Sequence, residues 1–223
     1  MNKISVADIV RFVRKTPAGR VTFIANLKKP KVQTNDEGGN YWIISSSAIS
    51  QVFRSEELIV LDDKVDSVIE KKKSATAKIS KDMYQCNIDI LHNAKEFDFQ
   101  DLKPYFSVSY IKNTKSILEL RGVPIQIIPN HVFTFEENGQ KKVGAIWFVA
   151  KKDTYSKEEL AIFVYSLHQY LKNMWGNKYE VSDDYCIAFD ITVGHKLNYK
   201  EIVSSNYQEF IKETLIDLRK AIQ

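Results

Sequence analysis

The chain has 223 residues, of which 44% are hydrophobic and 12% aromatic, and its formal net charge is +4 at pH 7. This length can bury a core without disulfides or metals, and the apolar content excludes an intrinsically disordered chain. No apolar run is long enough to span a membrane, and the first residues lack the basic-then-apolar pattern of a signal peptide. Cys86 and Cys186 lie far apart without metal-type spacing. We therefore expect reduced thiols and a cytoplasmic protein.

Positive charge is concentrated at the start of the chain. Residues 1–34 hold eight basic residues and one acid, Asp8, so this segment carries +7 and the remainder −3. A basic surface attracts phosphates, although a solvated helical face is the alternative interpretation. Lys151 and Lys152 stand at the exit of a predicted buried strand and have the same two interpretations. The predicted nucleic-acid-binding residues are Arg11, Arg14, Lys15, Lys28, Lys29, Lys151 and Lys152.

The first hundred residues are predicted to be mostly helical. Ser5 and Asp8 have the spacing of a capping box at the start of a helix, and Pro17 is expected to close that helix. The proline, asparagine and glycines that follow Leu27 predict a loop. The expected elements are helices from Ser5 to Pro17 and over 20–27, 56–72 and 81–94, a loop over 28–40 and an aromatic linker over 97–110.

Strand signals dominate the second half of the chain. Asn138-Gly139 is the strongest short hairpin signal, and the almost entirely apolar segment 143–149 predicts a strand buried on both faces. Ser156, with Glu158 and Glu159 in the first turn, predicts the start of a long helix. The expected elements are strands over 116–120, 125–128 (open to continuation past Pro129 over 132–135), 143–149 and 185–193, and helices over 156–175 and 199–222.

This order of elements predicts an α/β (α+β) fold with a mixed central sheet flanked by helices. We expect a mostly helical N-terminal lobe over residues 1–100 and an α/β core over residues 101–223. The two parts are expected to form one compact unit.

Three segments of the second half carry a recognisable pattern. GVPIQIIPN ends in Pro129-Asn130, KKVGAIWFVAKK ends a buried strand at Lys152, and LHQYL places Gln169 and Tyr170 on the long helix. Over residues 116–195 this order of hairpin, buried strand and helix resembles the core of the PD-(D/E)XK nuclease superfamily. The RecB-type and Cas4-type branches are the nearest likeness.

The resemblance implies a modified metal site. Family members place an Asp at the end of one strand and Glu/Asp-X-Lys on the next, so that two carboxylates hold Mg²⁺ while the lysine orients water or stabilises charge. Here Asn130 stands at the Asp position, Ala150 at the second acidic position and Lys152 at the lysine. Since Asn130 and Ala150 supply no carboxylate, the resemblance implies a scaffold that has lost cleavage.

Three hypotheses follow. The first is a non-catalytic, degenerate PD-(D/E)XK-like accessory that binds DNA or RNA without a cofactor, in a mobile-element or defence system. The second is an active Mg²⁺-dependent nuclease whose acids have migrated to Asp190, Glu119 or Glu136. The third is a protein–protein interaction module with no nucleic-acid role. None involves a membrane, and the oligomeric state is open. The candidate catalytic residues are Asn130, Lys152, Asp190 and Gln169.

Each candidate also has a structural interpretation. Pro129-Asn130 is typical of a turn, and Asp190 could instead bond a backbone amide, since a buried carboxylate needs a partner. His131 has no visible orienting partner for a catalytic role. We expect His168 to be a structural residue of the long helix. The aromatic residues of the first half could stack on nucleic-acid bases or pack in the core, and core packing is the preferred interpretation.

Overall fold

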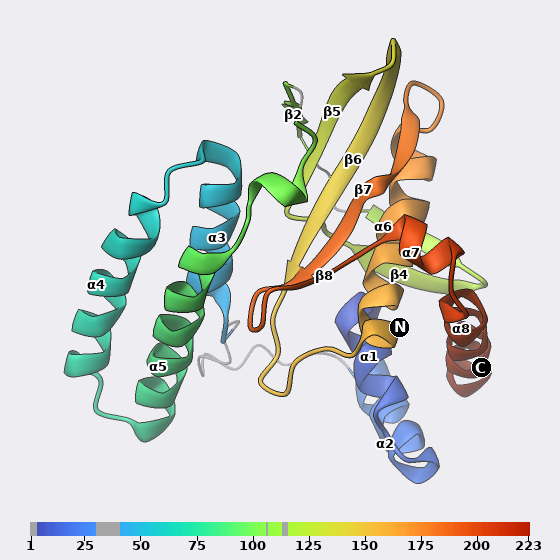
Figure 1. Ribbon diagram of the computed structural model, residues 1–223. Helices are drawn as coiled ribbons and strands as arrows, with labels where there is room; N and C mark the ends of the chain where they lie inside the picture. Colours follow the sequence, from blue (N-terminus) through green and yellow to red (C-terminus); the bar gives the residue numbers. More distant parts are fainter. Residues whose placement is uncertain (1–3, 30–40, 106, 113–115) are drawn as a thin grey trace.

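The computed structural model describes residues 4–29, 41–105, 107–112 and 116–223. Within these ranges a five-stranded mixed sheet stands between two helical layers, beside a smaller three-stranded sheet (Figure 1). The protein is thus a mixed α/β fold with sheets flanked by helices, as predicted. Most of the predicted 28–40 loop lies outside the described residues. None of the described helices has the length and apolar character needed to cross a membrane.

The larger sheet positions the candidate site. Its strands are β2 (Ser109–Ile111), β5 (His131–Glu137), β6 (Gln140–Val149), β7 (Glu180–Asp190) and β8 (His195–Asn198), in the order β2-β5-β6-β7-β8. The β5–β6 hairpin turns at Asn138 and Gly139, which have positive φ angles of 52° and 77°. β6 and β7 are parallel and are joined by α6 (Lys157–Trp175), which begins with the Ser156–Glu159 capping box.

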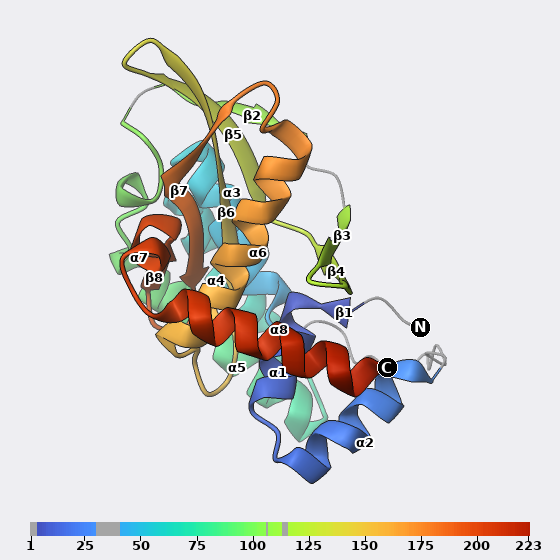
Figure 2. The ribbon, with the colours of Figure 1, turned by 90° about the vertical axis from the view of Figure 1, so that its right-hand side faces the viewer.

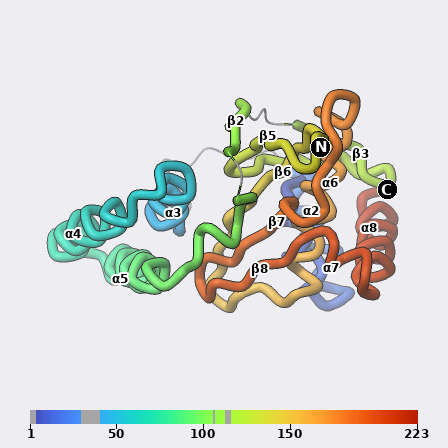
Figure 3. The backbone as a smooth tube through the Cα atoms, turned by 45° about the horizontal axis from the view of Figure 1, so that its top comes forward, coloured from blue at the N-terminus to red at the C-terminus, as the bar shows by residue number. Residues whose placement is uncertain are grey.

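The helices fall into two groups on opposite faces of this sheet (Figures 2 and 3). One face carries α6, α1 (Val6–Val13), α2 (Pro17–Lys28), α7 (Tyr199–Val203) and α8 (Tyr207–Ile222). The other carries α3 (Ile43–Ser55), α4 (Ile59–Ser74) and α5 (Lys78–Asn93). The predicted N-terminal lobe is therefore divided, because α1 shares a core with the C-terminal half.

Alternate residues of β6 project to opposite faces of the sheet, and each face builds its own core. Val143, Ala145 and Val149 pack toward α6 and α1, whereas Ile146 and Phe148 pack toward α3–α5. This alternation explains why the strand is apolar throughout, and it confirms the prediction of burial on both faces.

The smaller sheet ties the start of the chain to its second half. It has the order β1-β4-β3, with β1 (Ile4–Ser5), β3 (Ser116–Leu120) and β4 (Val123–Ile127). β1 pairs in parallel with β4, and Ser5 then caps α1 through the predicted capping box with Asp8. The Arg121-Gly122 turn between β3 and β4 has positive φ at both residues.

Several predicted boundaries are wrong for local reasons. Pro17 begins α2 instead of closing the preceding helix, because a proline in the first turn has no hydrogen bond to lose and Thr16 supplies the cap. The strands on either side of Pro129 belong to different sheets and are not one strand. The helix predicted over 199–222 is interrupted between α7 and α8. The strand predicted over 185–193 is β7, which begins and ends earlier, and β8 was not predicted.

Candidate nucleic-acid interface

A cleft of 640 Å³ lies at the C-terminal end of β6, between α1, the start of α3 and the loop that leads into α6. We call it the β6 cleft. Two cations, Arg11 and Lys151, line it together with the hydroxyl residues Ser5 and Ser46. No acidic residue is among its lining residues in the described part of the chain. Its aromatic residues are Tyr41, Trp42, Trp147, Phe148, Tyr155 and Phe163.

Lys151 is the lysine that reaches the cleft. It lies two residues after Val149, the last residue of β6, and its Nζ lies 5.9 Å from the centre of the Tyr155 ring. Lys152 is exposed and does not line the cleft. Of the two predicted lysines, Lys151 therefore lines the cleft and Lys152 does not.

The two arginines of α1 have different roles. Arg14 forms a bidentate ion pair with the buried carboxylate of Glu159, and its Nη2 donates to the carbonyl of Thr154 at 2.8 Å. This hydrogen bond to Glu159 raises the pKa of Arg14. Arg11 forms an ion pair with Asp8, its Nη1 donating to Oδ1 at 3.0 Å, and keeps 65% of its side chain exposed. Arg14 thus fixes α1 to α6, while Arg11 remains available to a ligand.

Two phenols of the cleft stay protonated at neutral pH. Burial raises the pKa of Tyr155 to about 12, and the charge of Asp190 adds to the shift. Partial burial and a hydrogen bond to Cys86 raise the pKa of Tyr41 to about 12 as well. The cleft therefore contains neutral rings and hydroxyl groups, with Arg11 and Lys151 as its charges.

Asn130 serves the backbone of the sheet. Its Oδ1 accepts a hydrogen bond from the N–H of Phe148 at 2.8 Å, and its own N–H donates to the carbonyl of Ile146 at 3.1 Å. The side chain thus continues the β5–β6 pairing by one step beyond His131. The Asn130 side chain is thus part of the hydrogen bonding of the sheet.

Asp190 is fully buried at the end of β7 and bonded by its neighbours. One carboxylate oxygen accepts from the N–H of Tyr155 at 2.9 Å, and the other accepts from the N–H and hydroxyl of Thr192. The structural interpretation of Asp190, a carboxylate that bonds backbone amides, is confirmed. The hydrogen bonds that Asp190 accepts hold the end of the loop 150–156 and the turn that follows β7.

The three acids proposed for a migrated metal site do not converge. Glu136 pairs with Lys141 at the hairpin end of β6, whereas Asp190 pairs with Val149 at the other end, about 26 Å away along the strand. Glu119 is exposed on β3, in the smaller sheet. Within the described ranges, no group of three or more His, Cys, Asp or Glu residues could hold a metal ion.

The remaining predicted residues are dispersed. Lys15 is exposed between α1 and α2, Lys28 lines a separate hollow between α2 and α8, and Lys29 follows α2. Gln169 is half-buried on α6 and is not among the described lining residues of the β6 cleft. The structure thus brings together Arg11 and Lys151 from the predicted binding set.

Both candidate histidines are structural. His131 Nε2 lies 2.7 Å from Ser50 Oγ, its ring stacks on Phe53, and burial lowers its pKa. The ring of His168 stacks on Tyr199 with a centroid separation of 3.5 Å, and burial lowers its pKa to about 4. The charge of Lys172 lowers the pKa of His168 further, while the carboxylate of Asp183 lies 3.4 Å from Nε2.

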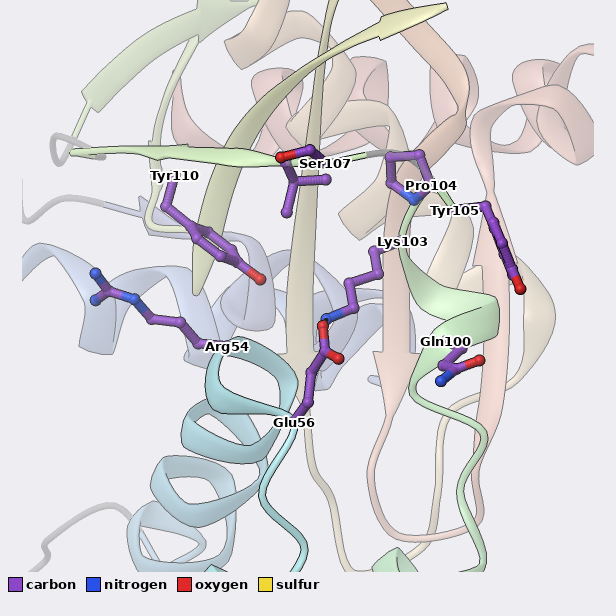
Figure 4. Close-up of a pocket in the computed structure, with 9 residues that line it drawn as sticks. Arg54, Glu56, Gln100, Lys103, Pro104, Tyr105, Ser107 and Tyr110 are labelled. Carbon is purple, nitrogen blue, oxygen red and sulfur yellow. Dashed lines mark hydrogen bonds and ion pairs between the residues drawn. The ribbon is translucent and has the colours of Figure 1, made fainter.

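A second hollow of 470 Å³ lies at the C-terminal end of α3 (Figure 4). Its lysine, Lys103, is buried and pairs with Glu56, whereas Arg11 of the β6 cleft stays largely exposed beside its partner Asp8. The guanidinium of Arg54 lies 5.5 Å from the centre of the Tyr110 ring. The carboxyl end of a helix disfavours anions. The β6 cleft is therefore the better anion site of the two.

Sequence reasoning missed Trp147 and Tyr155 as cleft residues. The spacing Trp147, Val149, Lys151 could have indicated a shared face, but the position of Tyr155 depends on the Arg14–Glu159 and Asp190 contacts, which are distant in sequence. In comparisons with known proteins, no family model, curated protein or solved structure matches this chain. The case for function therefore rests on the residues and geometry of the cleft.

Proposed function

We propose that this protein is a non-catalytic, degenerate PD-(D/E)XK-like protein that binds nucleic acid at the β6 cleft. The observation that carries the proposal is the lining of the cleft: Arg11 and Lys151 beside six aromatic residues, without an acid among the described lining residues. A role as an accessory in a mobile-element or defence system follows from the resemblance alone.

The chemistry of the cleft suits a single strand. Arg11 and Lys151 can contact phosphates, and the partly exposed rings of Tyr41, Trp42, Trp147 and Tyr155 offer stacking surfaces that every base can use. Bases in a duplex are already stacked, so they cannot enter such a cleft without melting. Its volume of 640 Å³ is that of a small-ligand site and suits one or two nucleotides of a longer strand.

The proposed loss of cleavage is supported by how the candidate groups are used. Asn130 accepts a hydrogen bond from the backbone of β6, and Asp190 accepts one from the backbone N–H of Tyr155. The residue before Lys151, Ala150, is apolar. Two carboxylates around one Mg²⁺ are the minimum that the family chemistry requires. These three positions supply none that is open to a metal.

The experiment is a combined binding and cleavage assay on labelled single- and double-stranded DNA and RNA, with Mg²⁺, Mn²⁺ or EDTA. We expect binding without cutting, equal in all three conditions, tighter for single strands and steeply weakened by salt. Metal-dependent cutting would establish the nuclease hypothesis instead. An absence of both binding and cutting would leave the protein–protein module.

A matched pair of variants locates the binding. Arg11→Gln/Lys151→Gln removes both cleft cations, whereas Lys141→Gln/Lys178→Gln removes two exposed lysines from the opposite end of the sheet. The cleft variant should lose binding and the control should keep it. Equal losses in both would indicate attraction by net charge alone.

A further inference from the structure

The tip of the α4–α5 hairpin carries a second concentration of positive charge. Residues 71–81, KKKSATAKISK, hold five lysines and no acid, in a chain whose net charge is only +4. The segment comprises the last turn of α4, the connection and the first turn of α5. We call it the lysine tip. In Figure 1 it lies at the lower left, where the hairpin projects from the sheet.

Three of these lysines have no ion-pair partner within the described residues. Lys72 donates to Gln85, and Lys73 pairs with Glu70 at 2.8 Å. Lys71, Lys78 and Lys81 are exposed, and no described carboxylate lies within ion-pair distance of them. Their charges therefore face solvent.

Helix stability does not explain the lysines of α5. Cations favour the carboxyl end of a helix, which accounts for Lys71 in the last turn of α4. Lys78 and Lys81 stand at the amino end of α5, where a cation opposes the helix dipole, and Ala77 supplies no side-chain cap. An electrostatic cost without a local gain is a sign of an interaction surface.

The lysine tip is linked to the β6 cleft through α5. Asn87 donates to the carbonyl of Tyr41 at 2.8 Å and accepts from the N–H of Ser45 at 2.9 Å, which fixes the middle of α5 beside the start of α3. Tyr41 lines the cleft. From Asn87 to Lys78 is about 14 Å along the helix. In Figures 1 and 2 the tip and the loop after β6 lie at the same lower end of the molecule.

We infer that the lysine tip is a second contact surface for the phosphate backbone of the nucleic-acid strand whose bases occupy the β6 cleft. This inference rests on the proposed function. Lys71, Lys78 and Lys81 contact phosphates without reading sequence, and the tip sets the direction in which the strand leaves the cleft.

The test uses fluorescence anisotropy of the full-length protein with a labelled single strand of about 16 nucleotides, a length in the range that single-strand sites cover. Lys78→Gln/Lys81→Gln is compared with the Lys141→Gln/Lys178→Gln control. We expect the tip variant to bind about tenfold more weakly at low salt, and its log–log salt slope to fall by about 1.4, which corresponds to two single-strand phosphates. The control should match the wild type.

Failure of the inference and failure of the proposed function are distinguishable. If the wild type and the tip variant bind equally while the Arg11→Gln/Lys151→Gln variant does not bind, binding at the β6 cleft is supported and the inference about the lysine tip is wrong. If the wild type binds no strand, both are overturned. Binding of the wild type, but not of the tip variant, to phosphatidylserine vesicles, with strand binding unchanged, would assign the tip to a membrane surface instead.

Discussion

The β6 cleft and the turns directly behind it make opposite use of charge. In the cleft, Arg11 and Lys151 are exposed to a ligand. Behind it, Asp190 and Glu159 are buried and fully engaged, the first by backbone amides and the second by Arg14. The cations are thus at the surface and the acids are structural, which is the reverse of what a metal nuclease needs.

This difference shows that an acid at the end of a sheet strand need not be a metal ligand. Asp190 has the type and the location of one, but its hydrogen bonds go to the chain itself. The predictions below test the two sides of this comparison, beginning with the largest expected effect.

Asp190→Ala tests the structural side. The substitution leaves the N–H groups of Tyr155 and Thr192 without their acceptor, and a buried unsatisfied donor costs about 1–3 kcal/mol. We expect the free energy of unfolding to fall by about 3–4 kcal/mol in urea titrations, with Asp153→Ala, an exposed neighbour, as the control. Unchanged stability would mean that Asp190 has another purpose.

The buried His168 predicts a pH dependence unrelated to the cleft. Its pKa falls from 6.5 in the unfolded chain to about 4 in the fold, so the unfolded state binds more protons between these values. Stability is fully present above pH 6.5 and is lost as the pH falls toward 4, by about 3 kcal/mol. His168→Phe keeps the stacking on Tyr199 and should flatten the profile between pH 4 and 6.5. A profile like that of the wild type would assign the titration elsewhere.

A substitution of one cleft cation at a time tests whether the cleft binds phosphate. Lys151→Gln should weaken single-strand binding by about tenfold and reduce the salt slope by about 0.7, the share of one phosphate on a single strand. Because the Nζ of Lys151 lies 5.9 Å from the centre of the Tyr155 ring and no ion pair holds it within the described residues, the free energy of unfolding should change little. Lys152→Gln, one residue further, is the matched control and should bind like the wild type. The opposite result would mean that Lys152 is the cleft lysine after all.

The smallest expected effect is an increase in stability. Lys78→Gln removes a cation from the amino end of α5 and should raise the free energy of unfolding by about 0.3–0.5 kcal/mol, measured at low salt. Lys71→Gln, at the carboxyl end of α4, should lower it slightly. A loss with Lys78→Gln would show that this lysine supports the fold.

Local signals predicted the elements well. The Asn138-Gly139 turn and the Ser156 cap act over a few residues, so the β5–β6 hairpin and α6 follow from sequence. The division of the strands around Pro129 into two sheets did not follow, since it depends on the parallel pairing of β4 with β1 more than a hundred residues away.

The site was predictable only in part for the same reason. Arg11 and Lys151 could be named from charge and position, but their meeting depends on Arg14 and Glu159, which join α1 to α6 across 145 residues. The choice between Lys151 and Lys152 was open in the sequence, and the packing of Trp147 and Val149 at the cleft decides it for Lys151.

The most direct test of the central claim is a titration of a labelled single strand in EDTA with the wild type and with Arg11→Gln/Lys151→Gln. The proposal predicts metal-independent binding by the wild type, a steep loss with salt, and little binding by the variant. Binding that requires Mg²⁺, or binding that survives loss of both cations, would contradict a phosphate-binding cleft without a metal.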